Sequence, residues 1–218
     1  MKLKWLGHAS FLIESASGTR IITDPYESGD FDGAIGYGPI AERADVVVVS
    51  HGHSDHNYVA GVAGDPKVVQ GPGTCHVAGV EFNGVACFHD DSNGRERGKN
   101  TMFVFDVDGI RVCHVGDLGH QPSKTQLAAL GPVDVLVLPV GGRFTIGAAE
   151  ASKLAETISP RVIIPMHYRT DKCTLPISGV DEFLQGKQKV KRPGSPEIDL
   201  TRDSLPAETE IIVLEHAL

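Results

Sequence analysis

The chain has 218 residues, of which 41% are hydrophobic and 22% charged, so it can bury a sizeable core and is excluded from the disordered classes. A formal net charge of −8 and the lack of any long lysine or arginine run exclude the basic stripe that nucleic-acid binding requires. Four cysteines without a C-x-x-C pair, no apolar export segment and no window near the ~18 apolar residues of a membrane span lead us to expect a cytoplasmic protein without a membrane partner.

Short runs of β-branched and aromatic residues, separated by glycine and proline, predict many strands. In chain order, the expected strands are residues 3–13 (interrupted by Gly7), 20–23, 45–50, 67–70, 80–88, 102–107, 110–115, 133–138, 161–165 and 210–214. Apolar residues at helical spacing predict a helix over residues 148–158, and residues 57–64 can form a shorter one. Residues 187–206 show no clear periodicity, so no helix or strand is predicted there. Neither a repeat nor a linker divides the chain, which predicts a single α/β domain over residues 1–218.

Residues 51–56, with the sequence HGHSDH, place four metal-binding side chains directly after a long apolar strand. In an extended segment the side chains at i and i+2 point the same way, so His51 and His53 can bind one metal ion. A helix that begins after His56 would turn Asp55 and His56 towards a second ion. A purely structural role for all four is the less favoured alternative, so the segment predicts half of a two-metal site.

The remaining ligands are expected at the ends of other strands, because strand ends converge at one edge of a sheet. His89, Asp117 and His167 each follow a predicted strand by no more than two residues. His76 is the alternative to His89, although it follows a Gly-Pro-Gly turn instead of a strand. Imidazole and carboxylate ligands favour two zinc ions, with manganese or iron as alternatives.

The order of these residues resembles the metallo-β-lactamase superfamily, whose hallmark is H-x-H-x-D-H followed by a distant histidine, an aspartate and a final histidine. Further segments resemble its zinc-dependent, lactonase-like hydrolase branch: GHAS at 7–10, GKNT at 98–101, HVGDLGH at 114–120, PVGG at 139–142 and PMHY at 165–168. The resemblance implies a four-layer αββα sandwich, in which two mixed sheets pack face to face and are flanked by helices.

Carried over residue by residue, the superfamily pattern implies two groups of metal ligands joined by a bridge. These are His51, His53 and His89 for the first ion, Asp55, His56 and His167 for the second, and Asp117 for the bridge. True β-lactamases of this type have cysteine where this chain has Asp117, and the chain lacks the H-T-x-G-H-T segment of glyoxalase-like members. Hydrolysis of β-lactams and of thioesters is therefore disfavoured.

The predicted chemistry is metal-dependent hydrolysis by a bridging hydroxide, because two cations lower the pKa of a shared water and polarise the scissile bond. Asp55 is the predicted catalytic residue, since it could orient the hydroxide and carry a proton to the leaving group. The expected substrate is a small, anionic molecule with an ester-like bond, either a lactone or a phosphodiester. A di-iron oxidoreductase on the same ligands and a non-catalytic metal-binding module are the alternatives, and a homo-oligomer is compatible with the sequence.

Six further residues are candidates for contacts with the substrate or with the ligands, each with an ordinary structural role as the alternative. They are His8, Arg95, Arg97, His114, His120 and Tyr168. Arg95 and Arg97 lie with Lys99 in a glycine-containing loop after His89, which could hold an anionic group or be a solvated turn. His114 is expected to form a supporting hydrogen bond or to lie in the core, and not to bind metal.

Overall fold

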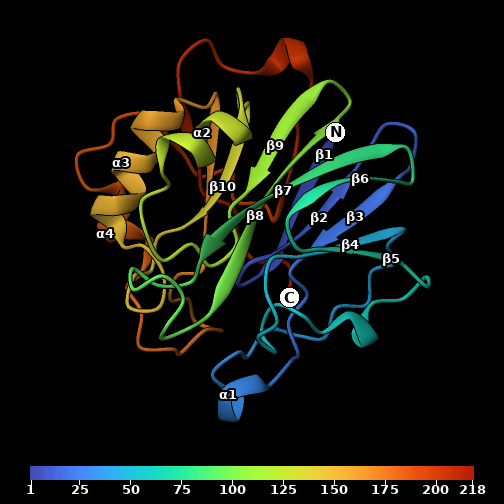
Figure 1. Ribbon diagram of the computed structural model, residues 1–218, viewed down its shortest axis with the longest axis horizontal. Helices are drawn as coiled ribbons and strands as arrows, with labels where there is room; N and C mark the ends of the chain where they lie inside the picture. The colour runs from blue at the N-terminus through green and yellow to red at the C-terminus, as the bar shows by residue number, and fades with distance from the viewer.

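The computed structural model describes residues 1–218, and its strands form two sheets that pack against each other (Figure 1). The six-stranded sheet has the order β13 (Glu197–Asp199), β1 (Lys2–Gly7), β2 (Ser10–Glu14), β3 (Arg20–Thr23), β4 (Val46–Val49) and β5 (Lys67–Gln70). The eight-stranded sheet has the order β12 (Val190–Lys191), β14 (Glu210–Ile212), β11 (Val162–Met166), β10 (Val135–Pro139), β9 (Ile110–His114), β8 (Lys99–Val107), β7 (Val80–Phe88) and β6 (Gly73–Val77). Each sheet contains parallel and antiparallel pairs, which confirms the predicted α/β class with two mixed sheets.

The central strands bury apolar side chains on both faces. One continuous cluster of buried residues takes side chains from both sheets, among them Trp5, Phe11 and Phe103. A second, smaller cluster lies on the other face of the six-stranded sheet, where Leu12 and Val47 point away from the first cluster. Alternate residues along one strand therefore belong to different cores, as a period of two dictates.

Helices α2 (Lys124–Leu130), α3 (Ala148–Ile158) and α4 (Val180–Leu184) gather on the side of the eight-stranded sheet (Figure 1). Helix α3 presents Ala151, Leu154 and Ala155 to the core, so its apolar stripe is the buried face of a covering helix. No helix in the structure is long and apolar enough to cross a membrane.

The six-stranded sheet has no comparable helical layer. The prediction of a helix over residues 57–64 is wrong. That segment forms only the 3₁₀ turn Val59–Gly61, and α1 (Asp30–Gly33) is a single distorted turn. Buried loop residues such as Tyr26, Ile35 and Tyr37 cover the sheet instead. A segment of this length without an apolar stripe cannot offset the cost of helix nucleation.

Residues 187–206, which lack periodicity, cross from one sheet to the other. Strand β12 pairs with β14 in the eight-stranded sheet, whereas β13 pairs with β1 in the six-stranded sheet. The backbones of Met1 and Leu200 also exchange two hydrogen bonds of 2.9 Å. The crossing segment therefore ties the two sheets together at their edges.

Candidate metal centre

The predicted metal ligands meet at the end of the sandwich where several strands terminate. His51 follows β4, His89 follows β7, and Asp117 and His167 follow β9 and β11. Strands β9, β10 and β11 are parallel, so the residues that follow β9 and β11 emerge at the same edge. Among the predicted ligands only His53 is exposed, and the others are buried between the sheets.

His51, His53 and His89 form the first group, with ligand atoms within 4.8 Å of one another. The Nε2 atom of His51 lies 3.1 Å from Nδ1 of His53, and the ring of His89 is 4.8 Å from that of His51, centroid to centroid. Burial lowers the pKa of His51 to about 3 and also lowers that of His53. Both rings are therefore neutral near pH 7, which is the form that binds metals.

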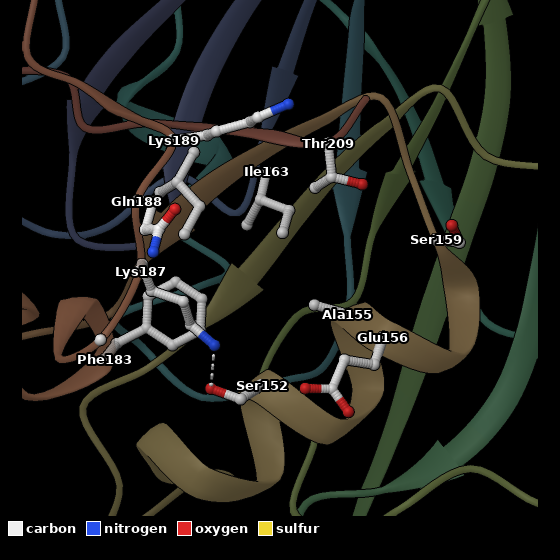
Figure 2. Close-up of a pocket in the computed structure, with 12 residues that line it drawn as sticks. Ser152, Ala155, Glu156, Ser159, Ile163, Phe183, Lys187, Gln188, Lys189 and Thr209 are labelled. Atoms are coloured by element: carbon white, nitrogen blue, oxygen red, sulfur yellow. Dashed lines mark hydrogen bonds between the residues drawn. The ribbon is translucent and has the colours of Figure 1, made fainter. Parts of the chain in front are cut away.

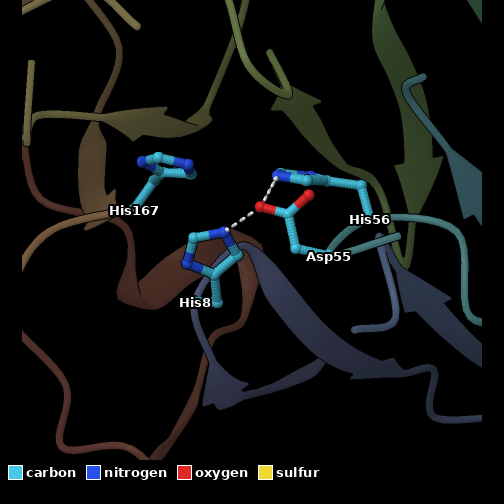
Figure 3. Close-up of side chains that lie close together, drawn as sticks. All are labelled: His8, Asp55, His56 and His167. Carbon is cyan, nitrogen blue, oxygen red and sulfur yellow. Dashed lines mark hydrogen bonds and ion pairs between the residues drawn. The ribbon is translucent and has the colours of Figure 1, made fainter. Parts of the chain in front are cut away.

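His8, Asp55, His56 and His167 form the second group, again with ligand atoms within 4.8 Å (Figure 3). His8 Nε2 donates a hydrogen bond of 3.0 Å to Asp55 Oδ2, and the rings of His8 and His167 lie 4.2 Å apart, centroid to centroid. Burial lowers the pKa of His8 to about 4, so this ring is neutral, and its Nδ1 atom has no partner. The structure thus places His8 inside the cluster, where it holds the Asp55 carboxylate in position.

Asp117 lies between the two groups. Its Oδ2 atom is 3.1 Å from His89 Nε2 and 3.3 Å from the Nε2 atoms of both His56 and His167. Burial alone would raise the pKa of Asp117, but the imidazoles of His167 and His56 hold it well below its ordinary value. An ionised carboxylate that contacts both groups has the position a bridging ligand needs.

Asp24 supports both groups, and the sequence analysis did not identify it. The buried Asp24 carboxylate accepts hydrogen bonds from His114 Nε2 (2.8 Å), His56 Nδ1 (3.0 Å) and the Ser50 hydroxyl (2.7 Å). The single hydroxyl hydrogen of Ser50 goes to Asp24, so Ser50 Oγ accepts from His51 Nδ1 at 3.0 Å. These hydrogen bonds at Nδ1 leave the Nε2 atoms of His51 and His56 directed at the cluster. Outer carboxylates orient histidine ligands in the same way in metal sites. The signal that could have found Asp24 is its position directly after the strand 20–23, the same signal that marked His89 and Asp117.

Three of these residues have backbone conformations that side chains other than glycine rarely adopt. The φ angles of His8, Asp24 and His167 are 51°, 37° and 49°. The His167 amide also donates to the His8 carbonyl at 3.2 Å, so the two strained turns are joined. Strain of this kind persists only where the surrounding structure holds it, and it is concentrated at functional sites.

Three glycines lie so close to this centre that a side chain would overlap a neighbouring segment. The contacts are Gly116 with Ser50, Gly119 with the backbone of His89, and Gly141 with the backbone of His167. The absence of a Cβ atom is therefore what lets the loops approach each other here.

The chemistry of the cluster fits divalent metal cations. Burial alone would lower the pKa of His56, but the carboxylates of Asp117 and Asp55 raise it well above its ordinary value, so the site favours positive charge. Asp117 Oδ1 and His8 Nδ1 are buried without a hydrogen-bond partner, a costly arrangement unless another group satisfies them. Imidazoles together with carboxylates are ligands that zinc accepts.

The structure separates the other predicted contact residues. His114 reaches the centre only through its hydrogen bond to Asp24. His120 has both ring nitrogens bound to backbone, since Nε2 accepts from the Phe88 amide and Nδ1 donates to the Gln121 carbonyl. His120 therefore shapes a loop and has no free nitrogen for a substrate.

Several candidates lie away from the metal ligands. Tyr168 packs its ring against Trp5 with centroids 5.2 Å apart, because the residue after His167 points into the core. Arg95 is exposed, whereas Arg97 lies over the ring of Phe144. His76, the alternative ligand, is exposed on β6 and bound to Glu81 at 2.8 Å. The structure thus brings neither Tyr168 nor His76 to the centre.

A cavity of about 510 Å³ lies at a distance from these residues, between α3, α4 and the C-terminal strands (Figure 2). Ile163, Phe183 and Ile211 contribute its apolar lining, and Lys187 donates to the Ser152 hydroxyl at 2.9 Å across it. None of the proposed metal ligands lines this cavity. Pocket size alone does not mark the site here.

Comparison with known proteins agrees with this geometry. The family model described as "Beta-lactamase superfamily domain" matches residues 2–167. A Thermotoga maritima structure, proposed to be a zinc-dependent hydrolase of the metallo-β-lactamase superfamily, is 39% identical, covers 98% of both chains and has a TM-score of 0.80. The chain belongs to the metallo-β-lactamase superfamily. The predicted family, the fold of two mixed sheets and the hydrolase class are thereby confirmed.

Other known proteins are similar to this chain at different levels. A UPF0173 metal-dependent hydrolase of Thermococcus kodakarensis is 34% identical over 199 residues, which cover 78% of this chain and 85% of that protein. The di-iron β-hydroxylase CmlA of Streptomyces venezuelae has a TM-score of 0.59 at 15% identity, with 84% of this chain and 50% of CmlA covered. The likeness to CmlA shows a shared fold alone.

Proposed function

We propose that this superfamily member is a dinuclear hydrolase that holds two zinc ions and cleaves an ester-like bond, in a lactone or a phosphodiester, in the cytoplasm. The observation that carries the proposal is the position of Asp117, whose Oδ2 atom lies within 3.3 Å of histidine nitrogens from both groups. Seven side chains exceed what one tetrahedral site can use. His51, His53 and His89 would hold one ion, and Asp55, His56 and His167 the other, with Asp117 shared.

Two cations bound here would lower the pKa of a shared water and polarise the bond to be cleaved. The chain itself supplies orientation and proton transfer. The ionised Asp55 carboxylate accepts from His8 and can take or return a proton at its other oxygen. Asp24 holds the ring of His56, and through Ser50 that of His51, so the ligands do not have to reorganise during the reaction.

Metal content is the first test of this proposal. We expect elemental analysis of protein purified without chelators to give close to two transition-metal ions per chain, with zinc predominating. His89→Ala removes a ligand of the first group only, so it should reduce the content to about one ion. His76→Ala is the matched control, because that histidine is exposed and bound to Glu81, and it should keep both ions.

A saturated wild-type protein with one ion or fewer would refute the dinuclear site. Activity on separate panels of lactones and phosphodiesters then identifies the bond. Turnover with bound iron and without hydrolysis of either panel would favour the oxidoreductase alternative.

A further inference from the structure

A second cavity, of about 370 Å³, is lined by residues that follow the proposed ligands His89 and Asp117 in the sequence, although no proposed ligand lines it. Its lining includes Asp90, Arg97, Gly119, His120, Arg143 and Phe144. Asp90 follows the ligand His89 directly, and Gly119 packs on the backbone of His89. The cavity is therefore next to the segments that carry His89 and Asp117.

Arg97 is held beside this cavity by the Asp90 carboxylate. Asp90 is buried and accepts hydrogen bonds from the backbone amides of Gly94 (2.7 Å) and Arg97 (2.7 Å), among others. The His89 amide also donates to the Gly98 carbonyl at 3.1 Å, which closes the loop. The loop thus folds back over Asp90 and presents Arg97 to the cavity, whereas Arg95 stays exposed.

Arg143, which is exposed, reaches the same cavity from the segment after β10. Gly141 packs on the backbone of His167 and donates to its carbonyl at 3.2 Å, so Arg143 is two residues away from a contact with a ligand of the second group. The φ angle of Arg143 is 59°, a strained value for a side chain other than glycine. Each arginine is therefore anchored next to a different group of ligands.

Both guanidinium groups contact the ring of Phe144. The Cζ atoms of Arg97 and Arg143 lie 5.8 and 5.6 Å from the centroid of the Phe144 ring, which is the distance range of a cation–π contact. Stacking on an aromatic ring holds a guanidinium group in one plane and leaves its N–H edge free to donate.

Three carboxylates line the cavity, and none forms an ion pair with either arginine. Both oxygens of Asp90 accept backbone amides, and Glu150 accepts from the Gly147 amide at 3.0 Å. Asp91 is exposed to solvent. Arg97 has only an exposed pair with Glu96, at 3.4 Å, and no ion pair involves Arg143. Two guanidinium groups with free N–H edges in a cavity are suited to bind an oxyanion.

We propose that Arg97 and Arg143 bind an anionic group of the substrate, a carboxylate or a phosphate, and so determine which esters the metal centre accepts. The inference rests on the proposed hydrolase function. The sequence predicts an anion site in the loop that carries Arg95, Arg97 and Lys99. The proposed site keeps only Arg97 from that loop and adds Arg143 from the segment after β10. A bound anion here would place the rest of the substrate against the centre, which is how remote contacts contribute to catalysis.

The test is calorimetric titration of the full-length protein with inorganic phosphate and, separately, with propionate. Wild type, Arg97→Ala, Arg143→Ala and the double variant are compared, with Arg95→Ala as the matched control from the same loop. Any anion bound by metal ions contributes equally to all of them, so differences isolate the arginines. We expect each cavity variant to weaken binding about tenfold or more, and Arg95→Ala to have no effect.

Binding of phosphate alone assigns a phosphate group, and binding of propionate alone assigns a carboxylate. Equal affinities in wild type and the double variant would overturn the inference. In kinetic assays the double variant should raise KM for an anionic ester without changing that for its neutral analogue. If the arginines bind anions but no ester is hydrolysed, the anion site stands and the proposed function fails. If esters are hydrolysed and the variants bind anions as wild type does, only the anion site fails.

Discussion

Asp55→Ala is expected to reduce hydrolysis at least about 100-fold, the usual contribution of a positioned acid–base group, while leaving the protein folded. Asp55 is the only carboxylate in the second group of ligands. Burial alone would raise its pKa, but His56 and His8 hold that pKa well below its ordinary value, so the carboxylate is ionised at neutral pH. Its removal takes away a proposed metal ligand and the group proposed to orient the nucleophile.

Ser54→Ala is the matched control for this variant, because Ser54 is the exposed neighbour of Asp55 within the same motif. It should retain wild-type activity. Circular dichroism and chemical denaturation check that Asp55→Ala is folded, and Asp55→Asn tests whether charge or shape matters. Retention of more than about a tenth of wild-type activity in Asp55→Ala would exclude this role.

Asp24→Ala should lower the free energy of unfolding by about 3–5 kcal/mol, because it breaks a buried charged network and leaves its partners unsatisfied. His56, His114 and Ser50 would all lose their acceptor. Metal affinity should fall about 10- to 100-fold, as expected when the group that orients a ligand is removed. Denaturant titration and metal competition assays measure the two effects.

The stability difference between wild type and Asp24→Asn should depend on pH. Burial alone would raise the pKa of Asp24, but His114 and His56 hold it well below its ordinary value. A group with a depressed folded-state pKa contributes its full stability above the unfolded pKa and loses it as the pH falls towards the folded value. The difference should therefore be constant near neutrality and shrink below about pH 4.

The exposed Asp203 offers a control, since Asp203→Ala should change the unfolding free energy by no more than about 0.5 kcal/mol at any of these pH values. A difference between wild type and Asp24→Asn that stays constant through pH 3 would contradict the buried ionic role of Asp24.

Much of the fold could be predicted because its signals are local. The predicted bounds 67–70, 80–88 and 148–158 coincide with β5, β7 and α3. The short strands β12 and β13 could not be predicted, since two or three residues carry no periodicity and their pairing depends on strands far away in the sequence. Helix α4 was missed for a related reason, because five residues are too few to show a helical period.

Some residues of the candidate site could likewise be predicted from local patterns, and others could not. The i, i+2 spacing of His51 and His53 and the position of other residues at strand ends are local patterns, and the structure brings those seven side chains together. Contacts between loops are not local. Asp24 looks like an ordinary turn residue before a proline, and Arg143 meets Phe144 and Arg97 only because two loops fold towards the same cavity.

The three glycines packed against the ligand-bearing segments restrict which substitutions the sequence can accept during evolution. Alanine at Gly119 or Gly141 would displace the backbone of a histidine ligand, although neither glycine carries a functional atom. Tolerance to substitution at these positions should therefore be as low as at the ligands themselves. A change of specificity is less constrained at Arg97 and Arg143, whose side chains line a cavity and can vary without moving the centre. Substitutions around the cavity can therefore change the substrate, while the proposed ligands and the three glycines keep the centre unchanged.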